Sequence, residues 1–199
     1  MKSDVLPVGL RLSGQHCLVV GSGEEAERRA TTLIGAGALV RVVGERPTEA
    51  LSVLGKSGTL ELAARPFTLT DLDGVWLALL TDLDRELAER ISRAAEASRV
   101  LFCAVDQPDF GTFSHLALAR SGNVTLAVST NGKAPALARR LREELERVLG
   151  ESNLSAFVER LVRLRDRTPS NERRAVLGRA VEEVRLTGRL EVPENDDDR

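Results

Sequence analysis

A glycine-rich segment near the amino terminus has the residue types that bind a dinucleotide pyrophosphate. It reads Gly21-Ser22-Gly23-Glu24-Glu25-Ala26, follows a short apolar run and opens a helical pattern. In a GxGxxA segment the first glycine permits a tight turn, the second lets the backbone approach the phosphates, and the small last residue keeps helix and strand close. The first amides of the helix then face the phosphates. We expect Gly21 to Glu25 to bind a dinucleotide; the alternative is a tight turn that only joins two packed elements.

A second polar pair, Glu45 and Arg46, follows the apolar run Leu39 to Val43. An acidic residue after this strand accepts hydrogen bonds from the adenosine ribose and selects NAD. Glu45 is the candidate; in the alternative alignment Gly44 occupies the usual acidic position and Glu45 is displaced from it by one residue. Arg46 would instead suit the 2′-phosphate of NADP, and a solvated loop is the remaining alternative. We prefer NAD as the cofactor.

Asp106 is the candidate catalytic residue. It comes directly after the apolar run Val100 to Val105, and so at the carboxyl end of a predicted strand. Ligands of open α/β sheets bind at that end of the strands. A carboxylate there can accept a proton from a substrate. The structural alternative is an aspartate that forms a turn before Pro108.

Cationic side chains follow Asp106 along the chain and would suit a substrate that carries several carboxylates, because arginine binds carboxylates through two N–H groups. They are Arg120, Lys133, Arg139, Arg140 and Arg142. We expect Lys133, which lies in a predicted turn, to be the main substrate contact. The alternative is a solvated helix face on which the arginines pair with Glu143, Glu144 and Glu146.

The composition argues against several other classes of protein. The chain of 199 residues has no tyrosine, which removes the acid of short-chain dehydrogenases, and only two histidines, His16 and His115, which are too few for a multi-histidine metal site. Its net charge of −2 argues against nucleic acid as a partner. No apolar run is long enough to span a membrane, and we see no signal-peptide core, so we expect a cytoplasmic protein. Cys17 and Cys103 lie in apolar runs and are expected to be reduced core residues.

The first half of the chain alternates apolar runs with amphipathic segments, which predicts an α/β fold with a Rossmann-type parallel sheet. Asp82 or Asp84 would cap the third helix. The expected strands are His16–Val20, Leu39–Val43, Thr59–Ala63, Val75–Leu80 and Val100–Val105, and the expected helices are Glu24–Ala36, one opened by Pro47, and Asp84–Ala97. Beyond Asp106 we expect strands at Thr112–Ala119 and Val124–Ser129, and helices at Ala136–Leu149, Leu154–Arg165 and Asn171–Leu186.

Several segments, spread over roughly residues 5 to 150, resemble the precorrin-2 dehydrogenase and sirohydrochlorin ferrochelatase family, which includes the amino-terminal module of siroheme synthase. The segments are Leu6-Pro7, Leu18 to Gly23, Ala26 to Arg29, Phe67, Leu72 to Leu77, Thr81-Asp82, Val105 to Pro108, Leu126 to Gly132 and Pro135 to Arg142. The chain departs from the family at Ser22, where a third glycine is common, at Ala104, where asparagine is usual, and over Phe110 to His115.

The resemblance implies an NAD-dependent precorrin-2 dehydrogenase that produces sirohydrochlorin and works as a homodimer, with the tetrapyrrole between the cofactor and the partner. It matches Asp106 to the catalytic aspartate, Ser129 to a serine lining the tetrapyrrole site, and Gly21–Glu25 and Glu45–Arg46 to cofactor segments. Ferrochelatase activity, with ferrous iron as a second substrate, stays open; His115 would then act as a transient ligand or proton carrier, or else as an ordinary core residue.

The implied organisation is an NAD-binding Rossmann domain at residues 1–112, a dimerisation region at 113–149 and a helical C-terminal domain at 150–190. The acidic tail at 191–199 is expected to be disordered. Two alternatives from other functional classes remain. One is a regulatory Rossmann protein that senses NAD without catalysis, and the other is a structural dimer whose cofactor site has decayed.

Overall fold

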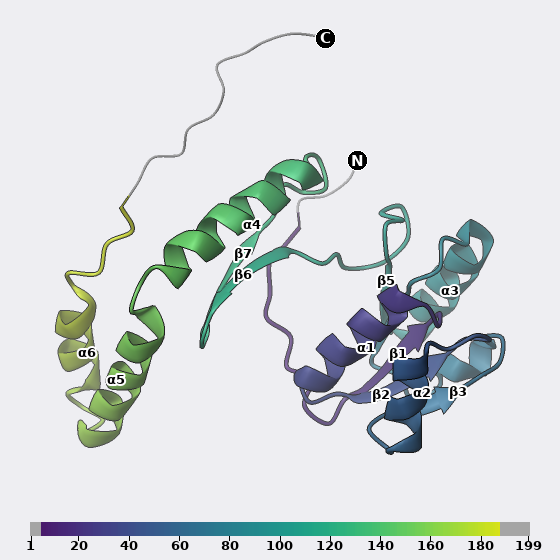
Figure 1. Ribbon diagram of the computed structural model, residues 1–199, viewed down its shortest axis with the longest axis horizontal. Helices are drawn as coiled ribbons and strands as arrows, with labels where there is room; N and C mark the ends of the chain where they lie inside the picture. The colour runs from purple at the N-terminus through teal and green to yellow at the C-terminus, as the bar shows by residue number, and fades with distance from the viewer. Residues whose placement is uncertain (1–4, 188–199) are drawn as a thin grey trace, which may run out of the picture. The chain divides into compact units, whose positions relative to one another are not determined.

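The apolar runs of the first half of the chain form a five-stranded parallel sheet in the order β3-β2-β1-β4-β5. Figure 1 labels β1, β2, β3 and β5 of this sheet. The computed structural model describes residues 5–187. The strands are β1 (His16–Val20), β2 (Leu39–Val43), β3 (Glu61–Ala63), β4 (Leu77–Leu80) and β5 (Leu101–Ala104). All four residues of β4 are buried, as expected of a central strand covered on both faces. The predicted α/β fold with a Rossmann-type sheet is confirmed.

Three helices connect these strands: α1 (Glu24–Gly35), α2 (Glu49–Lys56) and α3 (Arg85–Ser98). Thr48 caps α2 by accepting a hydrogen bond from the Leu51 amide, and Asp84 caps α3 by accepting one from the Leu87 amide at 2.9 Å. Asp84, and not Asp82, is therefore the cap. A short 3-10 helix at Leu69–Leu72, which we did not expect, precedes β4.

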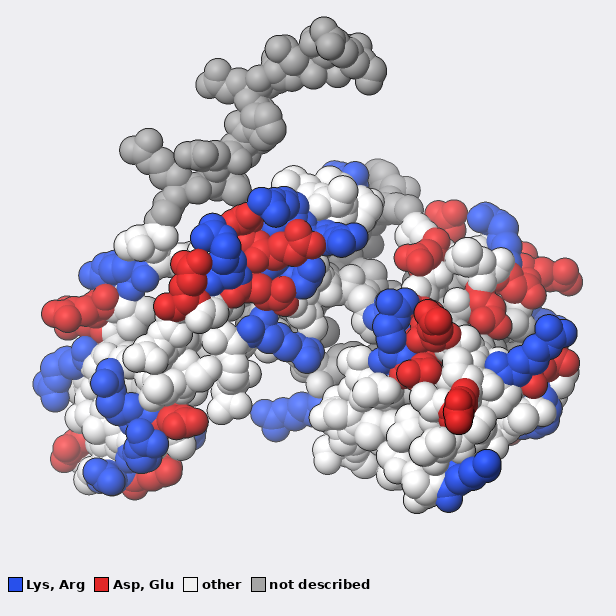
Figure 2. All heavy atoms as spheres, viewed as in Figure 1, with Lys and Arg blue, Asp and Glu red and all other residues white. Residues whose placement is uncertain are grey.

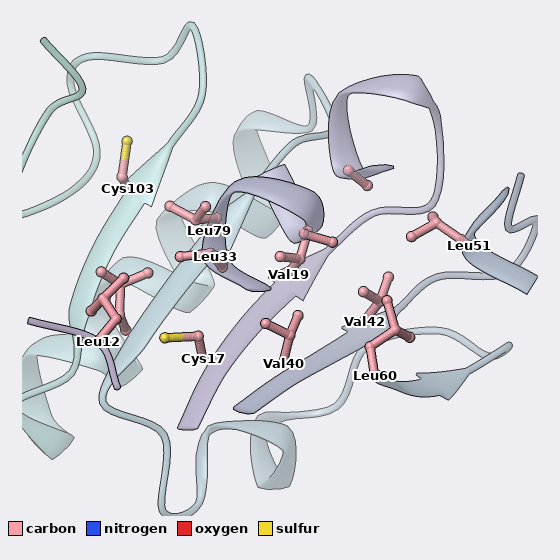
Figure 3. Close-up of a cluster of buried hydrophobic side chains, with 13 residues drawn as sticks. Leu12, Cys17, Val19, Leu33, Val40, Val42, Leu51, Leu60, Leu79 and Cys103 are labelled. Carbon is pink, nitrogen blue, oxygen red and sulfur yellow. The ribbon is translucent and has the colours of Figure 1, made fainter. Parts of the chain in front are cut away.

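The core lies on both faces of the sheet, because successive strand residues point to opposite sides. On β1, Cys17 and Val19 face one cluster and Leu18 and Val20 face the other. Figure 3 shows the first cluster, which includes buried residues of α1 and α2, while the second includes those of α3. Burial raises the pKa of the Cys17 and Cys103 thiols to about 11. Both cysteines are free and buried, so the expectation of reduced core residues is confirmed.

The strand expected at Thr112–Ala119 is misplaced. The observed strand β6 (Ala117–Ser121) begins later and pairs with β7 (Val124–Val128) in a separate two-stranded sheet. Thr112 instead folds back onto β5: its amide donates to the Phe102 carbonyl at 2.8 Å, and its hydroxyl accepts from the Phe102 amide at 3.1 Å. Phe113 then packs against the first core cluster. This segment covers the edge of β5, and an edge-covering segment shows the same apolar alternation as a strand.

The remaining helices are α4 (Pro135–Gly150), α5 (Leu154–Arg167) and α6 (Arg173–Val181). α4 begins one residue before the expected Ala136, at Pro135, because the missing N–H of a proline at the first position of a helix would have no partner there in any case. The predicted extent of α6, Asn171–Leu186, is too long. No residue of α6 is buried, so packing does not extend this helix beyond Val181.

The chain divides into two compact units. One runs up to Ala117 and includes Ser129–Leu137, and the other comprises Leu118–Val128 and the chain from Ala138 onward. The division into domains at 1–112, 113–149 and 150–190 stays a prediction, and the acidic tail at 191–199 lies outside the described residues. Among the helices of residues 5–187, none has the length and apolarity needed to cross a bilayer.

Candidate active site

The candidate residues of the first unit gather where β1 and β4 lie side by side. From β1 the chain moves outward to β2 and β3, and it then crosses back to β4 on the other side of β1. Such a reversal leaves a crevice outside the carboxyl ends of the two strands, and ligands of open α/β sheets bind there. Gly21 follows β1, and Thr81 and Asp82 follow β4, so these residues flank the crevice.

The backbone requires glycine at position 21. Gly21 has φ of +123°, and a Cβ there would lie 2.1 Å from Thr81 Oγ1 and 2.8 Å from Asp82 Oδ1. Its amide donates to the Val43 carbonyl at 2.8 Å, which holds the turn against β2. The tight turn expected of the first glycine is thus present, and any side chain would collide with the end of β4.

Gly23 faces open space and directly precedes α1 as its N-terminal cap residue. No atom lies within 4 Å of a Cβ built there, and no side chain caps the helix. The first bond of this turn runs from the Glu27 amide to the Gly23 carbonyl at 3.1 Å. The preceding amides at the start of the helix need acceptors, and a pyrophosphate supplies them. The small residue at the third position, Ala26, is fully buried. These features fit a dinucleotide.

Ser22 joins the glycine-rich loop to the segment that follows β2. Its hydroxyl accepts a hydrogen bond from the Arg46 amide at 3.2 Å, and its carbonyl accepts one from the Thr48 amide at 3.1 Å. A Cβ at Gly44 would lie 2.6 Å from the Ser22 Cβ, so glycine at position 44 makes room for the serine. Ser22 thereby fastens the glycine-rich loop to the segment that carries Glu45 and Arg46.

Glu25 does not present a bare negative charge to a phosphate. It pairs with Arg28, and with Arg29 at 2.7 Å. Partial burial opposes the shift, but hydrogen bonds from Arg29 and Arg28 lower the pKa of the Glu25 carboxyl. The two guanidinium groups therefore offset the repulsion that this residue would otherwise exert. Glu24, in the same turn, is exposed.

Asp106 lies at the carboxyl end of β5, as predicted, and its backbone is unusual. It is exposed and has φ of +58°, in the left-handed region that non-glycine residues seldom occupy. The turn closes with a bond from the Gln107 amide to the Ala104 carbonyl at 3.2 Å. The Gln107 side chain also donates to the Asp82 carbonyl at 3.1 Å. Such backbone outliers cluster at functional sites when the surroundings hold them in place.

His115 lies close to α1. Its ring meets that of Phe113 edge to face, with the ring centres 5.5 Å apart. Desolvation by the surrounding chain and the positive charge of Arg29 lower the pKa of the imidazole, although the residue as a whole keeps solvent contact. The imidazole is therefore neutral near pH 7. His16 is the first residue of β1 and so lies at the amino ends of the strands, at the edge of the sheet opposite Asp106.

Ser129 and Lys133 belong to one tight turn. The Ser129 hydroxyl accepts from the Asn131 amide at 3.1 Å, and the Lys133 amide donates to the Thr130 carbonyl at 2.9 Å. The side chains of Ser129 and Lys133 are exposed. Arg120 lies on β6, in the other compact unit.

The arginines of α4 pair with glutamates on the surface of the helix, which was the alternative to binding a substrate. Arg139 pairs with Glu143 at 3.0 Å and Arg142 with Glu146 at 2.6 Å. Arg140 likewise pairs with Glu144 at 2.5 Å. Figure 2 shows the basic and acidic side chains interleaved along this helix. In contrast, neither Lys133 nor Arg120 has a carboxylate partner within residues 5–187.

Two residues of this edge were not predicted to have a role. Asp82 appeared as a possible helix cap and in the family-like segment Thr81-Asp82, and Gln107 appeared in the family-like segment Val105 to Pro108, but neither was given a functional role. The register pairs Leu80 with Ala104, and two further residues along each chain lead to Asp82 and Asp106. The signal was therefore the equal spacing of the two aspartates from the ends of their strands, but it becomes visible only when β4 and β5 are known to be neighbours.

Two family models match the chain. One, described as putative NAD(P)-binding, covers residues 8–117, and the other, described as the central part of a sirohaem biosynthesis protein, covers residues 122–147. The first accounts for the sheet and the crevice, and the second for β7 and most of α4.

Siroheme synthases are among the similar curated proteins. Those of Salmonella schwarzengrund and Salmonella typhimurium are each 38% identical to the chain over 146 residues, which is 73% of this chain and 32% of the relative. The chain thus spans about a third of the length of these relatives. Among solved structures, SirC, a precorrin-2 dehydrogenase, superimposes with a TM-score of 0.75 and 20% identity and covers 90% of both chains, which shows a shared fold.

Proposed function

Because the chain belongs to the precorrin-2 dehydrogenase and sirohydrochlorin ferrochelatase family, we propose that it oxidises precorrin-2 to sirohydrochlorin with NAD as the hydride acceptor. The observation that carries the proposal is the placement of Asp106, in a backbone conformation that its neighbours hold, at the same sheet edge as the glycine-rich loop. A proton acceptor beside a dinucleotide site is what this oxidation needs.

Each group at the edge has one task in this reaction. The amides that begin α1 bind the pyrophosphate, and Glu45 accepts hydrogen bonds from the adenosine ribose, which favours NAD over NADP. Ser22 holds these two segments together. When bound, NAD supplies the nicotinamide ring that takes up a hydride. Asp106 accepts the proton that leaves the substrate, and the carbon that loses the hydride gains a double bond.

The tetrapyrrole contacts are a further part of the proposal. Precorrin-2 carries several carboxylates, and Lys133 and Arg120 are cations without a carboxylate partner among the described residues. We assign these two, with Ser129 and His115, to substrate binding. Arg120 lies on β6, outside the compact unit that holds the glycine-rich loop and Asp106, and we propose that a second copy of the chain completes the site in a homodimer. We further propose that this homodimer functions in the cytoplasm and has neither nucleic acid nor a membrane as partner.

Insertion of ferrous iron into sirohydrochlorin is a second candidate activity, and the neutral imidazole of His115 favours it. A neutral imidazole has a free lone pair, so it can receive a proton from the macrocycle or bind the incoming metal transiently. Iron is here a substrate. Addition of ferrous or cobaltous ion after complete oxidation, followed through the absorbance of the metallated product, tests this activity.

The dehydrogenase is tested by mixing the protein with precorrin-2 and NAD without oxygen and following the pigment's absorbance. We expect conversion that depends on NAD and that falls by at least about 100-fold in Asp106→Ala, the range typical of a lost acid–base group. Asp73→Ala is the matched control, because Asp73 is exposed and precedes β4 at the opposite edge of the sheet.

Thermal shifts separate the two alternative functions, since a ligand of the native state raises its apparent stability. A protein that only senses the nucleotide would be stabilised by NAD but would neither bind tetrapyrrole nor convert it. A structural dimer with a decayed site would respond to neither ligand. Full activity of Asp106→Ala would refute the role given to this carboxylate.

A further inference from the structure

Asp82 is a carboxylate without a structural task. It is exposed at the carboxyl end of β4, two residues before the actual cap of α3, Asp84. No hydrogen-bond donor of residues 5–187 reaches its carboxylate. Partial burial and the negative charge of Asp84 raise the pKa of the Asp82 carboxyl. Because Asp82 is exposed, its carboxylate oxygens are open to hydrogen-bond donors of a ligand.

The carboxylate of Asp82 overlies the crevice. Its Oδ1 atom lies 2.8 Å from the position that a Cβ of Gly21 would occupy, so it stands directly against the first glycine of the loop. Two bonds fix the backbone that carries it. The Thr81 amide donates to the Val20 carbonyl at 2.9 Å, and the Asp82 carbonyl accepts from the Gln107 side chain at 3.1 Å.

The order of groups along the sheet edge indicates which part of the nucleotide Asp82 meets. Crossing from β2 through β1 and β4 to β5, the edge presents Glu45, then the open start of α1, then Asp82, and finally Asp106. An extended NAD molecule presents its adenosine ribose, pyrophosphate, second ribose and nicotinamide in the same order. With Glu45 at the first ribose and Asp106 at the reacting ring, Asp82 falls at the second ribose.

Hydrogen-bond chemistry agrees with this assignment. An ionised carboxylate only accepts hydrogen bonds, and so does a phosphate, so Asp82 and the pyrophosphate cannot satisfy each other. The two neighbouring hydroxyl groups of a ribose are donors, and their bonds to a carboxylate are assisted by its charge. We propose that Asp82 binds the ribose hydroxyls of the nicotinamide half of the dinucleotide and so positions the nicotinamide ring beside Asp106. This inference rests on the proposed function.

Three nucleotides distinguish this role in a calorimetric titration of the full chain: NAD, ADP-ribose, which keeps the second ribose, and ADP, which lacks it. We expect Asp82→Ala to weaken the binding of NAD and ADP-ribose at least tenfold and to leave ADP unchanged. Asp82→Asn keeps the size of the side chain but loses its charge, and it should weaken the same two ligands. Circular dichroism confirms that the variants are folded.

Asp84→Asn is the matched control. It removes a nearby negative charge, while asparagine still caps a helix well, so binding of all three nucleotides should be unchanged. Equal weakening of ADP by Asp82→Ala, or unchanged binding of NAD and ADP-ribose, would overturn the assignment. Failure of the unmodified protein to bind any of the three would instead refute the proposed nucleotide site, and the ribose contact with it.

Discussion

Two positions of the same loop require glycine for different reasons. A side chain at Gly21 would collide with Thr81 and Asp82 and occupy a positive φ, whereas one at Gly23 would meet no protein atom. We predict that Gly21→Ala lowers the free energy of unfolding by about 2 kcal/mol or more. Gly23→Ala should leave stability within about 0.5 kcal/mol but weaken NAD binding at least tenfold, because its methyl group would occupy the space for the pyrophosphate. Urea unfolding and calorimetric titration measure the two effects; equal losses in both variants would contradict the distinction.

Asp71 is a buried carboxylate with a structural role. Only 1% of the residue is exposed, and it accepts hydrogen bonds from Arg65 at 2.6 and 2.8 Å and from the Thr68 amide at 2.8 Å. The bonds from Arg65, and then those from Thr68, lower the pKa of the Asp71 carboxyl to about 2 although burial opposes the shift. The pair joins the end of β3 to the turn before β4.

This depressed pKa predicts how stability depends on pH. Because the folded-state pKa lies below that of the unfolded chain, the contribution of Asp71 is fully present above about pH 5 and is lost as the pH falls from about 4 through 2. Its size is about 1–2 kcal/mol, since Arg65 is partly exposed. Urea unfolding at pH 6 and pH 3 should show this loss in the unmodified protein and a smaller one in Asp71→Asn. An identical pH dependence in both proteins would argue against the assignment.

At the scale of elements, the segment that covers β5 depends on one aromatic side chain. Phe113 packs against the first core cluster and keeps Thr112 bonded to the strand edge. Phe113→Ala should therefore lower the free energy of unfolding by about 2–3 kcal/mol, less than for a fully buried phenylalanine. Leu83→Ala, at a residue 77% exposed, should change it by less than about 0.5 kcal/mol. Denaturant titration compares the two, and equal destabilisation would show that Phe113 is not an anchor.

Local patterns in the sequence predict the elements that local forces decide. β1 and β2 have the predicted bounds because a glycine directly follows each apolar run, Gly21 after β1 and Gly44 after β2. The segment around Thr112 was misplaced because the sequence does not record that it bonds to Phe102. The position of Asp106 after a strand is enough to single it out, whereas the role of Asp82 becomes apparent from the adjacency of β4 to both β1 and β5, which the order of elements along the chain does not reveal.

For the whole molecule, we predict a homodimer. The β6–β7 pair is a two-stranded sheet of its own, and residues such as Leu126 remain half-buried in the single chain. An isolated hairpin of this size is marginally stable in water, so a second copy that covers it would stabilise it. Sedimentation equilibrium should give twice the chain mass of 21.6 kDa at micromolar concentration. A monomer that retains full dehydrogenase activity would contradict a shared site.

The deep burial of Cys17 and Cys103 also has a practical use. Thiols react as thiolates, and a pKa near 11 leaves almost none of that form at neutral pH. Maleimide reagents should therefore spare both native sulfurs while the fold is intact. One cysteine placed at the surface would then carry a dye alone, and its emission would report the arrival of a nucleotide without any need to remove the native pair.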